Sequence, residues 1–398
     1  MPQKLHTDLP SELEPVREAA RRALGSVKPA TASTPADRDF LFNAKRTDAG
    51  RKLPAQHLVY FVLVDLLGYR NLGKFEKLAW SIPIEFNERA FLIEHRKFGV
   101  GIFAADLEKD EADAQQIVNH IHKAVRTARP FFDWLAARAI DDSAVNVTNK
   151  SVSLFDRFEF LRDSYGLKAN EAETRKGERV IKTGKSGNGG DWQTISFPAF
   201  RLRAEAKWLG LAAIEAFFSW TEHVLIHIGI LRGRLTSANE VTRAAEANWP
   251  TKFKLAFDLA DERSKKLYDD LLIVRKELRN FAAHGSFGKQ GEAFHFHSSA
   301  GAVPVLLPDP IGSRRFALGE PSAFDLQHAL QTIEEFIEHL WEGPRAPARI
   351  YVQKYELPLI LTMAHDGTYG RAMTSIDEMT SFADYLAGQL DRAADMDW

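Results

Sequence analysis

The 398-residue chain contains no cysteine. This absence excludes thiol nucleophiles, disulfide bonds and thiolate metal sites. Neither sign of charge dominates, because 52 Lys and Arg residues stand against 54 Asp and Glu residues, so any contact with nucleic acid must rest on a local patch. Residues 1–10 lack the apolar segment of a signal peptide. We therefore expect a cytoplasmic protein.

Long uncharged apolar runs are also missing. The most apolar stretch, Trp208 to Leu231, has the length of a membrane span but carries Glu215, Glu222, His223 and His227. Ionisable groups at such depths in a bilayer are unfavourable. The stretch is therefore predicted to be a buried helix of a bundle, and no membrane contact is expected.

Hydrophobic periodicity predicts a mostly α protein in three parts. These are an N-terminal α/β or α+β domain at 1–145, an antiparallel helical bundle at 150–345 and a C-terminal strand-helix extension at 346–398. We expect helices at 11–26, 53–67, 110–139, 151–165, 201–231, 249–260, 263–284, 323–341 and 375–394. Strands are expected at 80–86 and 90–104, with a turn near 97–99, and a hairpin or extended excursion at 291–307. The other expected segments are an extended piece at 349–361, a linker at 27–37 and a mobile Gly-rich loop at 174–191.

The helix expected at 263–284 has the most informative pattern. Leu267, Leu271, Val274, Leu278 and Phe281 recur at steps of four and three, which makes one apolar stripe. At about 100° per residue, the polar residues near the end of this helix fall away from the stripe. They are Arg279, Asn280 and His284, and Gly285 follows as a typical helix stop.

This Arg-Asn-x-x-x-His pattern, on the penultimate long helix of an all-α bundle, resembles the signature of the HEPN superfamily of ribonucleases. The resemblance covers roughly residues 150–345. It implies metal-independent RNA cleavage by a homodimer with a composite active site, with Arg279 and His284 as the catalytic pair and Asn280 in support. No cofactor and no metal ion are expected. By analogy with the family, we expect toxin-like or antiviral RNA degradation, and a separate inhibitor is a candidate partner.

The chemistry of RNA explains why these residue types suit such a site. The 2′-hydroxyl lies beside the scissile phosphorus, so the protein only has to move protons and stabilise the pentacovalent phosphate. The imidazole of His284 can act as general base or acid, and the guanidinium of Arg279 offers a bidentate phosphate contact. The expected products carry 2′,3′-cyclic phosphates, and DNA should be inert.

Other charged residues of the expected bundle are candidates for support. Glu215 and Glu222 lie on one stripe of the long apolar helix, and either can orient Arg279 if that stripe faces the motif helix; a plain surface stripe is the alternative. Basic residues at the two ends of the same helix can bind phosphates or form a solvated face. They are Arg201, Arg203, Lys207, Arg232 and Arg234.

Three further patterns resemble known sites but lack a required part. Thr183 to Ser186 reads Thr-Gly-Lys-Ser, without the earlier glycine of a P-loop. His295 and His297 share one face of an expected strand, yet no third metal ligand is marked by spacing. Glu222, His223 and His227 have the wrong order for a zinc-protease motif. None of the three is predicted to be a functional site.

Two rival interpretations remain open. In one, the bundle is a catalytically silent module for dimerisation or binding, and His284 serves only as a helix C-terminal cap. In the other, the N-terminal domain binds or transfers nucleotides and the bundle is an accessory. The paired acidic strand residues and the Gly-Ser loop that such chemistry uses are not visible in the sequence.

Overall fold

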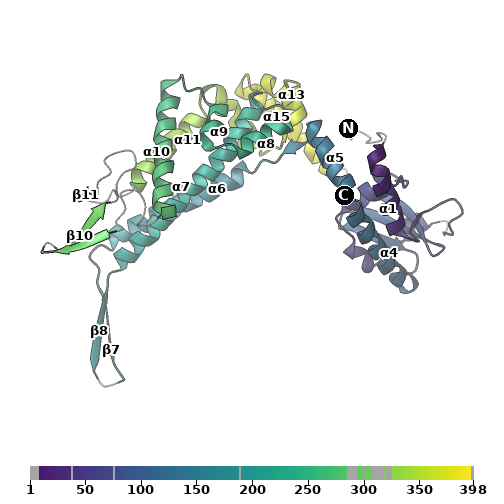
Figure 1. Ribbon diagram of the computed structural model, residues 1–398, viewed down its shortest axis with the longest axis horizontal. Helices are drawn as coiled ribbons and strands as arrows, with labels where there is room; N and C mark the ends of the chain where they lie inside the picture. Colours follow the sequence, from purple (N-terminus) through teal and green to yellow (C-terminus); the bar gives the residue numbers. More distant parts are fainter. Residues whose placement is uncertain are drawn as a thin grey trace. The chain divides into compact units, whose positions relative to one another are not determined.

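The computed structural model shows a mostly helical chain with small antiparallel sheets (Figure 1), so the prediction of a mostly α protein is confirmed. Its contacts form two compact units, residues 1–142 with 385–398 and residues 143–384. The structure describes residues 9–36, 39–74, 77–187, 190–284, 294–299, 301–306, 317–318 and 325–395, without the side chains of 42, 279–284, 295, 304, 306, 317–318 and 393–395.

The first unit is built on a five-stranded antiparallel sheet in the order β1-β3-β4-β5-β2. Apolar and other side chains alternate along β3, and Ile82, Ile93 and Ile102 face one another across β3, β4 and β5. All three are fully buried on the face that packs against helices. The strands are β1 (Lys28–Pro29), β2 (Lys45–Arg46), β3 (Leu78–Phe86), β4 (Arg89–Arg96) and β5 (Gly99–Ala104).

The short helices α2 (Phe40–Asn43) and η2 (Ala49–Lys52) of this unit were not predicted, and two predicted helices differ in form. The helix expected at 110–139 is two helices, α4 (Leu107–Thr127) and α5 (Arg129–Asp141), because Pro130 cannot continue an α-helix from the preceding turn. The helix expected at 53–67 is α3 (Gln56–Tyr60) followed by a π-helical segment, η3 (Phe61–Leu66). The remaining helices are η1 (Ser11–Leu13) and α1 (Glu14–Leu24).

The second unit is centred on a long antiparallel helix pair, α6 (Ser151–Thr174) and α7 (Pro198–Leu231). Shorter helices pack around this pair, and several begin with a side-chain cap, such as the reciprocal capping box of Ser237 and Glu240. They are α8 (Ala238–Glu246), α9 (Trp249–Ala256), α10 (Glu262–His284) and α11 (Leu326–Leu340). Helix α8 was not predicted, and α6 extends nine residues beyond the expected end at 165.

Aromatic side chains fill the core between these helices. Phe217 and Trp220 on α7 are fully buried, and Phe336 on α11 packs edge-on against Phe217 with ring centroids 5.7 Å apart. Trp249 on α9 donates from Nε1 to the Thr221 hydroxyl at 3.0 Å, which satisfies its polar atom inside the core. These contacts fix α7, α9 and α11 relative to one another.

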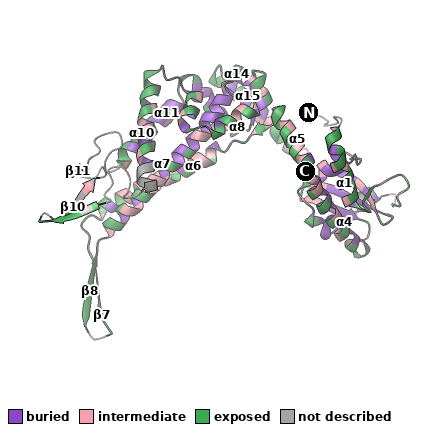
Figure 2. Ribbon diagram, viewed as in Figure 1, coloured by how far each residue is buried: buried purple, intermediate pink, exposed green. Residues whose placement is uncertain are grey.

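A β-hairpin joins α6 to α7 where a mobile loop was predicted. Strands β7 (Val180–Lys185) and β8 (Asp191–Ser196) pair antiparallel over their full lengths. Figure 1 shows this ribbon extending from the far end of the helix pair, and Figure 2 shows both strands exposed. The prediction failed because neither face is buried, so the sequence has no apolar alternation to mark the strands.

The segment after α11 is mainly helical, so the extended piece predicted at 349–361 is wrong for most of its length. It forms part of α12 (Ala346–Arg349), the π-helical η6 (Ile350–Lys354) and a short strand, β12 (Leu359–Ile360), which pairs with β6 (Asn146–Val147). Residues 346–384, which the sequence set apart as an extension, group with the second unit. The remaining elements are η5 (Gly343–Arg345), α13 (Leu361–His365), α14 (Thr368–Ala372) and α15 (Ile376–Asp395).

Between α10 and α11 the described backbone forms strands, as predicted at 291–307. Strand β9 (Phe294–Ser298) pairs with β10 (Gly301–Leu306), which also pairs with β11 (Ala317–Leu318). Within the described residues, α7 is a helix that is long and apolar enough to cross a membrane by length and composition. However, 61% of its apolar window is buried inside the protein. That burial is typical of the core helix of a bundle.

Candidate functional site

The Arg279 to His284 segment forms the last six residues of α10. The apolar stripe that precedes it behaves as predicted, since Leu267, Leu271 and Val274 are buried, as is Leu278. The side chains of residues 279–284, including Phe281, lie outside the described part of the chain. The structure therefore establishes the helical backbone of the motif and the packed face that leads to it.

The nearest described polar cluster lies one helical turn before the motif. Arg275 on α10 donates from Nη2 to Oε1 of Glu222 on α7 at 3.1 Å. Lys252 on α9 donates from Nζ to Oε2 of the same carboxylate at 2.7 Å. Glu222 thus links three helices, and we name Glu222, Lys252 and Arg275 the three-helix ion cluster.

The burial of this cluster makes its charges structurally important. The Lys252 side chain is only 5% exposed, whereas Glu222 and Arg275 are about one third exposed. The Arg275 guanidinium also lies over the ring of Phe218, 5.5 Å from its centroid. A buried ammonium needs its counter-charge, so Glu222 holds both α9 and α10 against α7.

The two glutamates predicted as supporting residues have different positions. Glu222 faces α10, but the described partner is Arg275 rather than Arg279. Glu215 is exposed, and among the described contacts it makes no hydrogen bond or ion pair. Sequence reasoning missed Arg275 and Lys252, because the partner of a helical charge depends on how the helices cross.

The rings of His223 and His227 are in contact, with centroids 4.0 Å apart and planes tilted by 39°. Nε2 of His223 accepts from the backbone N–H of Lys150 at 2.9 Å, and Nδ1 of His227 contacts the carbonyl oxygen of His223 at 2.8 Å. Burial lowers the pKa of His223 to about 3 and that of His227 to about 4. Both rings are therefore neutral at pH 7, and His223 connects the start of α6 to α7.

Metal binding gains no support from the described geometry. Across the described parts of the chain, no three His, Asp or Glu side chains come together in a group that could hold a metal ion. His297 lies on β9 and is exposed, and the side chain of His295 lies outside the described part of the structure. Thr183, Gly184 and Lys185 are in β7, which leads into a second strand rather than a helix. That topology differs from a P-loop.

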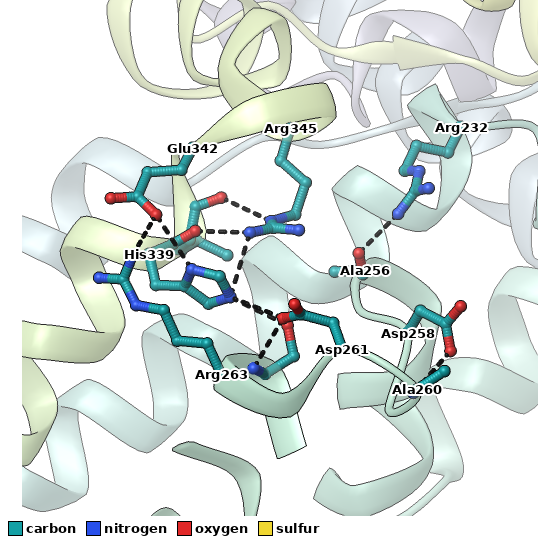
Figure 3. A network of polar contacts seen from close by, with 11 residues as sticks. Arg232, Ala256, Asp258, Ala260, Asp261, Arg263, His339, Glu342 and Arg345 are labelled. Atoms are coloured by element: carbon teal, nitrogen blue, oxygen red, sulfur yellow. Dashed lines mark hydrogen bonds and ion pairs between the residues drawn. The ribbon is translucent and has the colours of Figure 1, made fainter. Parts of the chain in front are cut away.

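A polar network at the other end of α10 was not predicted (Figure 3). The Ser264 hydroxyl lies 2.9 Å from Nε2 of His339, and Nδ1 of His339 lies 3.1 Å from Oε2 of Glu342. Serine, histidine and carboxylate have the same connectivity in hydrolytic triads. The residues are 75 positions apart in the chain, so no local pattern announces them.

The surroundings of this network favour a structural role. Ser264 is 2% exposed, so a substrate carbonyl has no access to its hydroxyl. Asp261 accepts from the backbone N–H of Ser264 at 2.8 Å, which caps the start of α10. Arg345 donates to the carbonyl oxygens of His339 and Leu340 at the end of α11. The network therefore fastens the first turn of α10 to the last turn of α11.

Most of the basic residues at the ends of α7 are engaged within the protein. Arg232 donates to the Ala256 carbonyl oxygen and Arg234 to those of Lys254 and Leu255, so both cap α9. Arg201 pairs with Glu205, and Arg203 lies 3.7 Å from Glu173. Lys207 also has an interaction partner. This basic group is a weak candidate for phosphate binding.

A groove of about 730 Å³ runs between α6 and α11 in the same unit. Its lining is mixed, with charged, amide and apolar side chains. They include Arg162, Tyr165, Leu167, Asn170, Gln327 and Glu334. Arg162 is already paired with Glu159 and Asp163 on its own helix.

No protein-family model matches the chain, and neither does a curated protein or a solved structure. The HEPN resemblance therefore rests on the Arg279 to His284 motif and its position in the helical unit.

Proposed function

We propose that this protein is a metal-independent endoribonuclease of the HEPN type, whose active site is shared by two copies of the chain. The proposal is carried by one observation: the Arg-Asn-x-x-x-His segment ends a helix, α10, whose inner stripe is packed in the core of an antiparallel bundle. A rigid helix is a suitable support for groups that must act on a phosphodiester.

The roles of the three motif residues follow from the reaction. His284 removes the proton of the 2′-hydroxyl or protonates the departing 5′-oxygen, and its copy in the partner subunit takes the complementary step. Arg279 binds two non-bridging phosphate oxygens, and Asn280 orients the imidazole or donates to phosphate. Glu222 is proposed as a positioning residue, because through Arg275 it holds the turn of α10 that precedes Arg279. Glu215 has no role in this scheme.

Exposed apolar side chains on α6 and α7 support the dimer that the proposal requires. Phe160 and Leu167 on α6, and Phe200 and Trp208 on α7, are each at least 66% exposed. Phe160 and Leu167 lie seven residues apart and so share one face of α6, and an exposed apolar face is typical of a surface that meets a partner. A second copy of the chain is the partner that would complete a composite site.

The direct test is RNA cleavage by the full chain in the presence of excess chelator. We expect cleavage of single-stranded RNA, 2′,3′-cyclic phosphate ends by mass spectrometry, and no cleavage of the matching DNA. His284→Ala should reduce the rate at least about 100-fold, as expected for loss of a general acid or base. His365→Ala, an exposed histidine on α13, is the matched control and should leave the rate unchanged.

The second candidate is a catalytically silent dimerisation module, which the exposed side chains of α6 and α7 favour equally. The same assay separates the two functions. Identical RNA profiles for wild type and His284→Ala, together with a dimer in sedimentation, would support the silent module. Under the nuclease proposal, a role in toxin-like or antiviral RNA degradation and restraint by an inhibitor follow by analogy only.

A further inference from the structure

The β7–β8 hairpin carries an exposed tryptophan ring that lies over a glycine of the neighbouring strand. Trp192 lies directly across from Gly184 in the antiparallel register. A Cβ atom on Gly184 would come within 2.5 Å of Cζ2 of this indole. The glycine therefore lets the ring lie down on β7, and the side chain remains 46% exposed.

One face of the ribbon combines this ring with a cation and hydroxyl groups. Because side chains alternate along a strand, Lys182, Thr194 and Ser196 share the face of Trp192. Lys182 is exposed and forms no ion pair within the described part of the chain. The opposite face carries the cross-strand pair Ile181 and Ile195, each at least half exposed.

The charge of the hairpin region contrasts with that of the whole chain. Residues 175–196 contain five Lys or Arg and two Asp or Glu, a net charge of +3, whereas the chain as a whole has −2. Arg175 and Lys176, at the base, are paired with neighbouring glutamates. The cations further along the ribbon, Arg179, Lys182 and Lys185, are exposed.

We propose that the β7–β8 hairpin binds single-stranded nucleic acid, with a base stacked on Trp192 and a backbone phosphate contacted by Lys182. A flat exposed aromatic ring beside a lysine is the arrangement that proteins use to bind unpaired strands without reading their sequence. An isolated two-stranded hairpin is marginal in water, and a bound strand would cover the side chains that now face solvent. This proposal rests on the proposed function, because the bound single strand is the RNA that the nuclease cleaves.

Fluorescence anisotropy on the full chain tests this proposal independently of cleavage. The probe is a fluorescein-labelled 12-nucleotide uridine RNA, and every protein carries His284→Ala so that the probe stays intact. Trp192→Ala should weaken binding roughly 5- to 150-fold, the range expected for loss of one stacked base. Trp192→Phe should keep most of the affinity. Lys182→Gln should weaken binding and reduce the slope of log affinity against log salt by about 0.7.

Two control variants separate the ribbon face from other exposed surfaces. Phe98→Ala removes an exposed aromatic side chain from the first unit, and Ile195→Ser changes the opposite face of the hairpin. Both should bind the probe like the parent protein. Because Trp192 and Lys182 lie on an exposed ribbon, circular dichroism should show an unchanged helical unit in every hairpin variant.

The outcomes distinguish this proposal from the proposed function. Unchanged affinity in Trp192→Ala and Lys182→Gln, or a parent protein that does not bind the probe, would overturn it. Dissociation of a dimer by Trp192→Ala would also overturn it and assign the ribbon to self-association. If the wild-type protein binds the probe through the hairpin but cleaves no RNA, the RNA-binding proposal stands and the nuclease proposal is wrong.

Discussion

At the residue scale, Lys252 is a charged side chain whose burial limits substitution. Its ammonium is almost completely buried and has one described carboxylate partner, Glu222. The same carboxylate also accepts from Arg275. Removing the shared acceptor therefore leaves a buried positive charge uncompensated, and that situation destabilises a protein more than the pair itself stabilises it.

Glu222→Gln should lower the free energy of unfolding by about 1–3 kcal/mol. The neutral amide still accepts a hydrogen bond but no longer balances two cations. Adding Lys252→Met should restore part of the loss, since it removes the buried charge. Urea unfolding measures both variants. Glu215→Gln on the exposed side of α7 is the control and should change stability by less than about 0.5 kcal/mol; equal effects of the two substitutions would contradict the role of the cluster.

The buried pair of His223 and His227 should make stability depend on pH. An unfolded histidine titrates near pH 6.5, whereas burial keeps His227 neutral in the folded protein down to about pH 4. The unfolded state therefore binds more protons between these values, and the free energy of unfolding falls as the pH drops from about 6.5 to about 4. The contribution of His227 is at most about 1.4 kcal/mol per pH unit.

His227→Phe tests this dependence, because it removes the titrating ring and keeps an aromatic side chain. Urea unfolding at pH 7, 6 and 5 should show the stability difference between the two proteins shifting in favour of the variant as the pH falls. Carboxylates titrate in both proteins and largely cancel in this difference. A constant difference at the three pH values would show that His227 is protonated in the folded state as readily as in the unfolded chain.

At the element scale, two glycines in the central helix pair have opposite surroundings. A Cβ atom on Gly166 in α6 would meet no atom within 4 Å, whereas one on Gly210 in α7 would lie 2.9 Å from Cδ2 of Leu326 and 3.2 Å from Cδ2 of Tyr165. Glycine inside a helix is less favourable than alanine by roughly 0.5–1 kcal/mol. Of these two positions, only Gly166 has room for an alanine that would gain this stability.

Gly166→Ala should therefore raise the free energy of unfolding by about 0.5–1 kcal/mol. Gly210→Ala should not raise the free energy of unfolding, because Leu326 or the backbone must move to make room for the new methyl group. Its free energy of unfolding should be at least about 0.5 kcal/mol lower than that of Gly166→Ala. Thermal unfolding of the two variants beside the wild type provides the comparison. A larger stabilisation from Gly210→Ala would mean that α7 and α11 are less closely packed than described.

Elements with one buried face were predictable, and elements held by distant contacts were not. The stripe from Leu267 to Leu278 identified α10 because its period matches a helix against a core. Residues 349–361 look extended, since Ile, Tyr and Val favour strands. Yet Tyr351 is fully buried in η6, where its ring stacks on Phe382. Tertiary packing overrides local preference there.

The candidate site shows the same division. A glutamate on the long apolar helix was a reasonable support for the motif, and Glu222 does face α10. Its partners could not be derived, because Arg275 and Lys252 lie 53 and 30 positions further along the chain. The Ser264 to His339 contact spans 75 positions. Short-range patterns locate helices, whereas ion pairs and networks depend on how those helices pack.

At the scale of the whole molecule, the nuclease proposal requires two subunits at each active site. Exposed side chains on α6 and α7 supply apolar surface for that association, and each subunit contributes one His284. If both imidazoles are needed, a mixed dimer of wild type and His284→Ala has no complete site. Activity then depends on how often two wild-type subunits meet.

Mixing the two proteins in equal amounts and allowing subunit exchange should therefore leave about one quarter of the activity of the same total amount of wild type, because only wild-type pairs are complete. A site contained within one subunit would leave about one half. An affinity tag on the variant verifies that mixed dimers have formed, and mixing with active Glu215→Gln should cause no loss. Activity that falls in simple proportion to the wild-type fraction, with mixed dimers present, would mean that each subunit cuts RNA with its own histidine alone.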